Sequence, residues 1–328
     1  MSVTADLAVG AGAFVASLAV TPLAATFARR VGLLDQPGPL KPHARATPYL
    51  GGIGVAAGTA VGAVLFHPWL LLPLGIALNL GVADDGHPLS PTTRLVGQTA
   101  TGVVLASVVS TRFSGPVSFA LVTVATVALM NGYNLLDGLD ALCGSVALVA
   151  ALGFAVILSG DQRYMALALA AATAAFLVFN LPPASVYLGD GGAYLIGAAM
   201  ATLLATSWAP GESVPTGIAG IALVTVPVLE LAFAVLRRIR SRHSPLHGDR
   251  DHPYDQLVRR GWSVHLTVAA YALAGLGLAA VAVVVDRLLR TPLALVCAGL
   301  AVAVLVVISL GAGFLAPHER RPSDGRTR

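Results

Sequence analysis

Long runs of apolar residues alternate with short polar segments along almost the whole chain. A helix needs about 20 apolar residues to cross a hydrocarbon core about 30 Å thick. By this measure the pattern predicts eleven membrane spans, of which the second and third are short and could form one bent hairpin around His67 and Pro68. The predicted spans are residues 7–28, 50–66, 69–83, 95–112, 117–131, 139–159, 163–180, 191–208, 214–236, 264–286 and 292–316.

The composition supports a membrane protein. Of the 328 residues, 56% are hydrophobic and 11% are charged, whereas a soluble domain carries about 25% charged residues. Mean hydropathy is +0.80. We therefore expect an all-α, polytopic membrane helical bundle with 10 or 11 transmembrane helices. We expect it to form one domain over residues 1–316, followed by a disordered cytoplasmic tail at residues 317–328.

The basic residues predict the orientation of the bundle. No basic residue precedes the first span, and Arg29 and Arg30 follow it at once, which is unlike a secretory signal peptide. With the amino terminus outside, only four of the 20 basic residues lie on the outer side. Those four are Arg112, Arg163, Arg287 and Arg290. Because cytoplasmic loops carry an excess of Lys and Arg, we predict that the amino terminus is outside.

The unusual polar side chains all fall in segments on the predicted cytoplasmic face. Five such segments carry acids, histidines or glycines, whereas outer loops such as "SGDQR" are short and bland. A purely structural distribution would scatter polar residues over both faces. We therefore expect an active site built from cytoplasmic loops.

Two adjacent aspartates, Asp84 and Asp85, follow the third predicted span. Neighbouring like charges so close to hydrocarbon are costly. A solvated helix end would explain one aspartate. A pair beside Gly86 is more consistent with two carboxylates that share a proton or hold a cation.

The segment "NGYNLLDGLD" spaces four polar residues by three, namely Asn131, Asn134, Asp137 and Asp140. On an unbroken helix this spacing drifts by about 60° per step. If Gly132 and Gly138 break the helix, the four side chains can converge. Amides and carboxylates suit a hard cation or a sugar phosphate. The alternative is an asparagine-rich cap and turn.

Asp190 and Glu230 are two further candidates. Asp190 lies in a glycine turn that opens a helix, where backbone N–H groups favour an anion and a carboxylate can add a bound Mg²⁺. Gly-Asp-Gly is also a common turn. Glu230 lies inside the ninth span, and intramembrane acids are functional by default, although it could instead make a structural hydrogen bond between helices.

The last polar segment carries His243, His247 and His252 among several arginines. A zinc site is disfavoured because no cysteine accompanies these histidines. A polybasic patch for lipid headgroups is one interpretation. The other is that His252 and nearby arginines such as Arg237 bind a diphosphate.

Taken together, the five segments resemble the polyprenyl-phosphate N-acetylhexosamine-1-phosphate transferase family, glycosyltransferase family 4. The likeness covers nearly the whole chain. The resemblance implies transfer of a sugar-1-phosphate, GlcNAc-1-phosphate above all, from a UDP-sugar to undecaprenyl or decaprenyl phosphate, with release of UMP. It implies Mg²⁺, or Mn²⁺, as cofactor, a bacterial plasma membrane location and a role in cell wall biogenesis. Dimers occur in this family, and no nucleic-acid partner is expected.

The resemblance also implies roles for individual residues. Asp84, Asp85, Asp137 and Asp140 would be catalytic, and Asp190 would be the metal ligand. The residues that would bind the substrates are Lys41, His43, Arg94, Asn131, Asn134, Glu230, Arg237 and His252.

The chain departs from the family pattern in several places. Arg94 stands where the family usually has lysine, and Tyr254 and Asp255 in the last loop stand where it has histidines. The other departures are Ser185 for lysine, Ala193 for serine and Glu230 for aspartate. A catalytically impaired homologue that binds nucleotide sugar or lipid phosphate is therefore an alternative. A transporter is disfavoured because the acids cluster at one face and no inverted repeat is visible.

Overall fold

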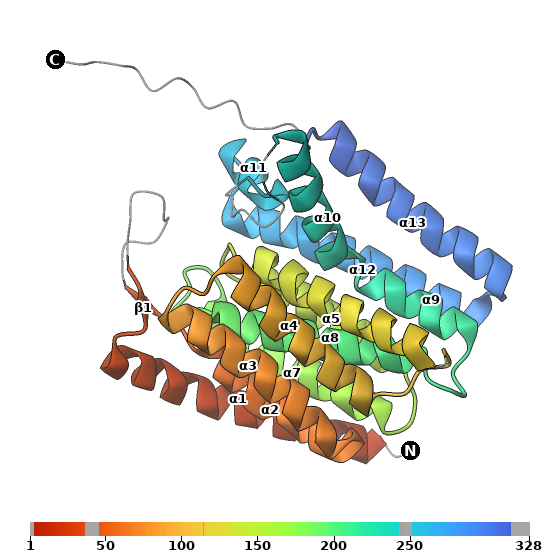
Figure 1. Cartoon of the computed structure of the whole chain (residues 1–328), viewed down its shortest axis with the longest axis horizontal. Coiled ribbons are helices and arrows are strands. Elements are labelled where there is room, and N and C mark those ends of the chain that lie inside the picture. The colour runs from red at the N-terminus through yellow and green to blue at the C-terminus, as the bar shows by residue number, and fades with distance from the viewer. Residues whose placement is uncertain (1–2, 37–45, 114, 243, 245–250, 316–328) are drawn as a thin grey trace.

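The computed structural model describes residues 3–36, 46–113, 115–242, 244 and 251–315, and it is almost entirely helical (Figure 1). The first helices are α1 (Val3–Val31), α2 (Gly51–Phe66), the 3₁₀ turn η1 (Pro68–Leu70), α3 (Leu71–Gly86), α4 (Pro91–Val108), α5 (Gly115–Leu136) and α6 (Leu142–Ile157). The remaining helices are α7 (Gln162–Asn180), α8 (Gly189–Ser207), α9 (Val214–Leu223), α10 (Thr225–Arg240), α11 (Pro253–Arg259), α12 (Val264–Leu288) and α13 (Thr291–Gly311).

Each predicted span coincides with a helix, except that the ninth is two helices. Helices α9 and α10 meet at an angle of 56°. The bend has a local cause, because Pro227 has no N–H to donate to the carbonyl of Leu223, where α9 ends. The second and third spans are separate helices with η1 between them.

Five helices, α1, α5, α7, α12 and α13, are long and apolar enough to cross a membrane, or six if α9 and α10 form one bent span. Others are shorter. Helices α2 and α6 have 16 residues each, which corresponds to about 24 Å. The prediction of a polytopic membrane helical bundle is confirmed. The total of 10 or 11 spans and the outer amino terminus stay predictions.

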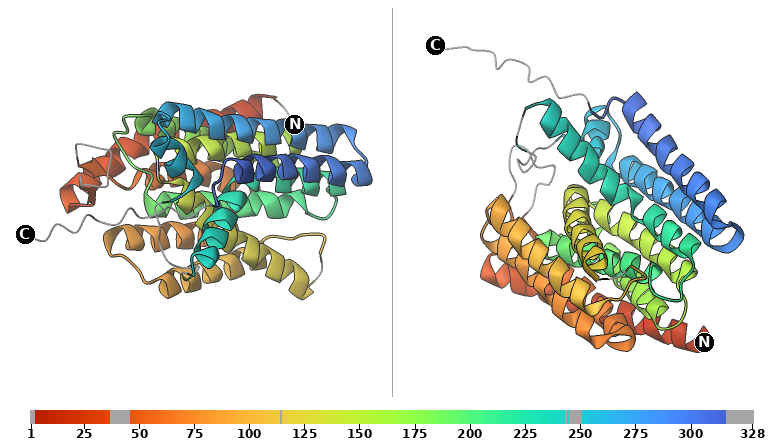
Figure 2. Two further views of the ribbon diagram at one scale, coloured as in Figure 1. Left: turned by 90° about the horizontal axis from the view of Figure 1, so that it is seen from above. Right: turned by 45° about the vertical axis from the view of Figure 1, so that its right-hand side comes forward.

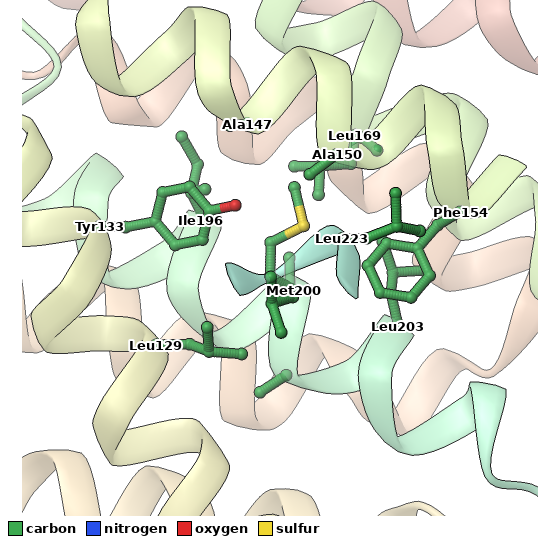
Figure 3. Packing of buried hydrophobic residues seen from close by; sticks show 14 of the residues in the cluster. Leu129, Tyr133, Ala147, Ala150, Phe154, Leu169, Ile196, Met200, Leu203 and Leu223 are labelled. Carbon is green, nitrogen blue, oxygen red and sulfur yellow. The ribbon is translucent and has the colours of Figure 1, made fainter. Parts of the chain in front are cut away.

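Helix α8 lies at the centre of the bundle, and nearly all of its residues are buried. It packs closely on α3 and α5. Figure 3 shows Leu129 and Tyr133 of α5 beside Ile196 and Met200 of α8. The contact with α3 depends on Gly81, where a Cβ atom would overlap the backbone of Asp190. This close approach brings the end of α3, with its two aspartates, against the start of α8.

The C-terminal helices α12 and α13 lie at the edge of the bundle (Figures 1 and 2). Helix α12 packs on α6 and α9, and α13 packs mainly on α9 and α12. An antiparallel pair of two-residue strands, β1 (Leu34–Asp35) and β2 (Thr47–Pro48), follows α1. This pair was not predicted, because two-residue strands leave no hydrophobic pattern. The predicted tail at residues 317–328 lies outside the described residues.

Candidate active site

Several of the polar segments predicted to be cytoplasmic meet at one end of the bundle. Asp85 at the end of α3 bonds to the start of α8, and Asn134 near the end of α5 bonds to the same place. Tyr254 of α11 bonds to Leu135 at the end of α5. The tertiary fold therefore gathers residues that are more than 100 positions apart in the sequence.

The start of α8 is capped by carboxylates of the protein itself. The carboxylate of Asp85 accepts hydrogen bonds from the N–H groups of Asp190 at 2.9 Å and Gly191 at 3.2 Å. Asp137 accepts one from the N–H of Gly189. The first N–H groups of a helix have no partner within the helix, and negative charge is favoured there. The sequence suggested an anionic ligand at this position, but the structure places Asp85 and Asp137 there.

Carboxylates crowd around Asp190. Its Oδ1 accepts a hydrogen bond of 2.6 Å from Asn134 Nδ2, and the carboxyl group of Asp84 lies within hydrogen-bonding reach. Burial raises the pKa of Asp137 well above its usual value, and the neighbouring Asp190 and Asp85 add to this rise. Such a cluster of acids is stabilised by a cation.

Asp84 differs from its neighbour in being buried and matched by a positive charge. The Nε atom of Arg94 lies 2.7 Å from Asp84 Oδ2. The other carboxylate oxygen accepts the N–H of Leu89 at 2.8 Å. The hydroxyl of Tyr194 donates to Asp84 Oδ2 at 3.2 Å. Asp84 therefore joins α3, α4 and α8, and Arg94 pairs with a protein carboxylate.

The asparagine–aspartate run does not converge as a set of four. Helix α5 continues through Gly132 to Leu136, so Asn131 stays on the helix. Asn131 donates to Gln98 of α4 at 2.6 Å. Asn134, Asp137 and Asp140 instead line a common pocket. Gly132 serves helix packing, because a Cβ atom there would lie 2.5 Å from the carbonyl oxygen of Pro227.

The pocket has a volume of about 690 Å³ and lies beside the carboxylate cluster. This volume is within the range of small-molecule sites. Burial, with Asp140 nearby, raises the pKa of Tyr187 to about 12. Described residues that line the pocket include Asp35, Tyr49, Asn134, Asp137, Asp140, Pro182, Tyr187, His252, Tyr254, Asp255 and His265.

Hydrogen bonds of Asp140 and Asn180 hold the loop after α5 in place. Asp140 accepts the N–H of Ala184 at 2.9 Å. Asn180 accepts the N–H of Ala141 at 2.9 Å and donates to the carbonyl of Val186 at 3.0 Å. Ala141 has a φ of 63°, a left-handed conformation that is costly for a residue with a side chain. The surrounding hydrogen bonds hold the loop in this conformation.

The acid inside the ninth predicted span positions a histidine. Glu230 is 2% exposed, and its Oε1 lies 3.0 Å from His252 Nδ1. Its Oε2 accepts a hydrogen bond from Tyr271 at 3.0 Å. His252 lines the pocket. Arg237 is buried, and its Nε lies 3.7 Å from Asp251.

Four candidate residues lie outside the described residues, namely Lys41, His43, His243 and His247. Sequence reasoning singled out neither Asn180 nor the pocket-lining residues Asp35, Tyr49, Tyr187 and His265. Tyr187 and Asn180 lie in a polar segment that the sequence marked, but nothing in their own residue types indicated a role.

The donor set restricts which metal could bind. Within the described residues, no group of three or more His, Cys, Asp or Glu side chains is arranged to hold a metal ion. Asp84, Asp85, Asp190 and Asn134 offer oxygen ligands. Mg²⁺ commonly binds through one or two carboxylates together with substrate phosphates and water. The residues therefore fit a hard cation that arrives with a phosphorylated substrate.

Comparison with known proteins identifies the family that the chain resembles. The model of the family described as Glycosyl transferase family 4 matches residues 67–207, a range that holds the carboxylates of Asp84, Asp85, Asp137, Asp140 and Asp190.

Two curated relatives illustrate the likeness. The probable undecaprenyl-phosphate N-acetylglucosaminyl 1-phosphate transferase of Bacillus subtilis (strain 168) is 26% identical, over 79% of this chain and 78% of its own length. The undecaprenyl-phosphate alpha-N-acetylglucosaminyl 1-phosphate transferase of Escherichia coli (strain K12) is 29% identical, over 77% and 78% respectively. The sequence resemblance is confirmed: the chain is a multi-pass membrane protein that is similar to these transferases, and its residues 67–207 match the model of glycosyl transferase family 4.

Proposed function

We propose that the chain transfers GlcNAc-1-phosphate from UDP-GlcNAc to a polyprenyl phosphate and releases UMP. The names of the relatives support transfer of this sugar phosphate to undecaprenyl phosphate. The observation that carries the proposal is the carboxylate cluster at the start of α8, which adjoins a polar pocket of about 690 Å³. The reaction would begin a cell-envelope glycopolymer at the cytoplasmic face of a bacterial plasma membrane.

The reaction balances as a phosphoryl transfer. An oxygen of the lipid phosphate forms a bond to the β-phosphorus of the UDP-sugar. The bond from that phosphorus to the bridging oxygen breaks, and UMP leaves with its electron pair. All reactants are anionic, so catalysis must come mainly from positioning and from charge stabilisation.

Asp190, with Asp84 or Asp85 nearby, would hold Mg²⁺ or Mn²⁺. A bound divalent cation would offset the charge of the diphosphate and of the departing UMP. The hydrogen bond from Asn134 fixes the orientation of the Asp190 carboxylate. Asp85 and Asp137 hold the start of α8, and thus the backbone of Asp190, against α3 and the α5–α6 loop.

The pocket would bind the donor. Asp137 and Asp140 can accept hydrogen bonds from hydroxyl groups, and the rings of Tyr49 and Tyr187 offer apolar surface. Glu230 and Tyr254 fix the orientation of His252 at the other side of the pocket.

Direct attack by the lipid phosphate is favoured over a covalent aspartyl intermediate. Asp84 is buried and already paired with Arg94, and Asp85 accepts two backbone N–H groups. A carboxylate held in this way is a poor nucleophile, because attack would break the contacts that stabilise it. The lipid phosphate is itself anionic near neutral pH.

The proposal is tested with protein purified in detergent, polyprenyl phosphate, UDP-GlcNAc and Mg²⁺. We expect release of UMP together with a lipid-linked sugar diphosphate, and loss of both products with EDTA. UDP-GalNAc and UDP-MurNAc-pentapeptide are compared as donors under the same conditions. Folded protein that binds UDP-sugar and turns over none of the donors would contradict the proposal and indicate a binding homologue. Light scattering on the same sample distinguishes a monomer from a homodimer.

A further inference from the structure

Tyr254 lies at the junction between the last polar segment and the acidic loop. Its side chain is buried, with 4% of the residue exposed. Its hydroxyl donates a hydrogen bond of 2.9 Å to the carbonyl oxygen of Leu135. This contact joins α11 to the end of α5 across 119 residues of sequence.

The carbonyl of Leu135 needs a partner from outside its helix. Helix α5 ends at Leu136, and the last four carbonyls of a helix have no N–H partner within it. The phenol of Tyr254 supplies a donor where the chain leaves the helix and enters the loop of Asp137 and Asp140. The hydrogen bond therefore acts on the backbone immediately before two candidate catalytic residues.

Gly138 fits directly against the same phenol. A Cβ atom at Gly138 would overlap the Tyr254 hydroxyl and would lie 2.7 Å from the ring carbon Cζ. Any side chain at position 138 would therefore displace the tyrosine ring or the loop. Gly138 lies between Asp137 and Asp140, so the loop that carries both acids is shaped around this ring.

The Tyr254 ring also contacts the histidine of the last polar segment. The rings of Tyr254 and His252 are stacked, with centroids 5.3 Å apart and planes 5° apart. His252 is held in turn by Glu230, which accepts the hydroxyl of Tyr271. One side chain thus contacts both the acidic loop and the histidine that line the pocket.

We propose that Tyr254 is a positioning residue, which sets the distance between the Asp137–Asp140 loop and His252 across the donor pocket. This role rests on the proposed function. The tyrosine stands where the family pattern has a histidine, and an imidazole has no hydroxyl opposite its attachment point to reach Leu135. The replacement of histidine by Tyr254 in the last polar segment is therefore a different way of holding the Asp137–Asp140 loop.

The test compares Tyr254→Phe, which removes only the hydroxyl, and Gly138→Ala, which displaces the ring. Tyr164→Phe is the matched control, because Tyr164 is partly buried and lies at the start of α7, the end away from the site. Amide hydrogen exchange is measured over residues 135–141, and kcat and the donor KM are measured with saturating Mg²⁺ and polyprenyl phosphate.

For Tyr254→Phe we expect exchange over residues 135–141 to rise about tenfold. We expect kcat to fall about 10- to 100-fold, because small displacements of reacting groups are costly. The donor KM should change less than kcat. Gly138→Ala should have the same effects at least as strongly, and Tyr164→Phe should have neither.

Wild-type exchange over residues 135–141 in Tyr254→Phe would overturn the proposal. A raised donor KM with unchanged kcat would also overturn it, since that result indicates a contact with the donor. A loss of activity that matches a loss of folded protein would overturn it as well. If the wild-type protein turns over no donor, the proposed function fails, and the exchange measurement still decides whether Tyr254 holds the loop.

Discussion

The two ends of the bundle differ in how their charged side chains are arranged. At the end formed by the starts of α1, α7 and α9 and the end of α12, several charged groups meet partners of opposite sign or backbone oxygens. Arg163 lies 3.3 Å from Asp6, and Arg287 lies 3.2 Å from Asp286. Asp286 also accepts the hydroxyl of Thr216 at 2.7 Å.

The end that holds the site also has ion pairs, but in addition it gathers like charges. Asp85, Asp137 and Asp190 lie close enough to repel one another. These carboxylates accept hydrogen bonds from backbone N–H groups and from the amide of Asn134. Arg94 neutralises Asp84, at one side of the cluster.

We interpret the difference as one between charges that hold the fold and charges that, under the proposed function, bind a cation. Opposite charges at the first end balance within the chain, so they can stabilise the protein without a ligand. Clustered carboxylates weaken the fold unless a cation offsets them. We therefore expect substitutions at the first end to change mainly stability, and substitutions at the end with the site to change mainly activity.

Metal removal is expected to have the largest effect. EDTA should abolish release of UMP, and added Mg²⁺ should restore it, because the carboxylate cluster and the anionic substrates both need a cation. The measurement is UMP formation before and after chelation, with circular dichroism as a check on folding. Unchanged turnover in EDTA would show that activity does not need a metal ion at the carboxylate cluster.

Asp190→Asn should come next. Loss of this carboxylate is expected to lower kcat by about 10³-fold, the order found when one electrostatic stabiliser is removed. Thermal stability should stay equal or rise, because repulsion from Asp84 and Asp85 is relieved. Kinetic assays and thermal unfolding monitored in parallel check both statements. Near-normal turnover would exclude Asp190 as the metal ligand.

Arg94 should affect both stability and activity, because it forms an ion pair with Asp84, and Asp84 belongs to the carboxylate cluster. Arg94→Met leaves the buried Asp84 without its cation, and we expect a loss of about 1–3 kcal/mol in unfolding free energy, because Arg94 is itself partly exposed. Activity should also fall, since Asp84 borders Asp190. Arg94→Lys keeps the charge and should recover most of the stability. If Arg94→Met were as stable as the wild type, the pair would not hold α4 to α3.

Asp286→Asn should have the smallest effect and serves as the counterpart of Asp190→Asn. It weakens a partly exposed ion pair with Arg287, which is worth about 0–1 kcal/mol. We expect a slightly lower unfolding temperature and unchanged kcat and donor KM. A change in kcat would show that the two ends are coupled through α12.

Much of the fold could be predicted because its cause is local. Apolar runs marked every helix from α1 to α10 and both C-terminal helices, since burial in lipid needs the same composition along a whole span. The bend between α9 and α10 and the strand pair formed by Leu34–Asp35 and Thr47–Pro48 were missed. Both depend on contacts of a few residues that do not alter hydropathy over a long window.

The candidate site could be predicted by residue type but only partly by role. Sequence placed the acids of five segments on one side of the membrane, and the described acids do meet at one end of the bundle. It could not show that Asp84 pairs with Arg94 while Asp85 caps α8, although the two are adjacent. It also could not show that Asn131 faces Gln98, or that Tyr254 contacts the acidic loop.

The sequence by itself therefore determined that this is a helical membrane protein, with acids in the polar segments that resemble glycosyl transferase family 4. Hydropathy and residue type are properties of short stretches of chain, and they need no knowledge of distant partners. The tertiary structure alone decided which carboxylates cap α8, which one is neutralised, and which side chains hold the loop of Asp137 and Asp140. Those outcomes depend on distances of about 3 Å between residues up to 119 positions apart, which no local pattern contains.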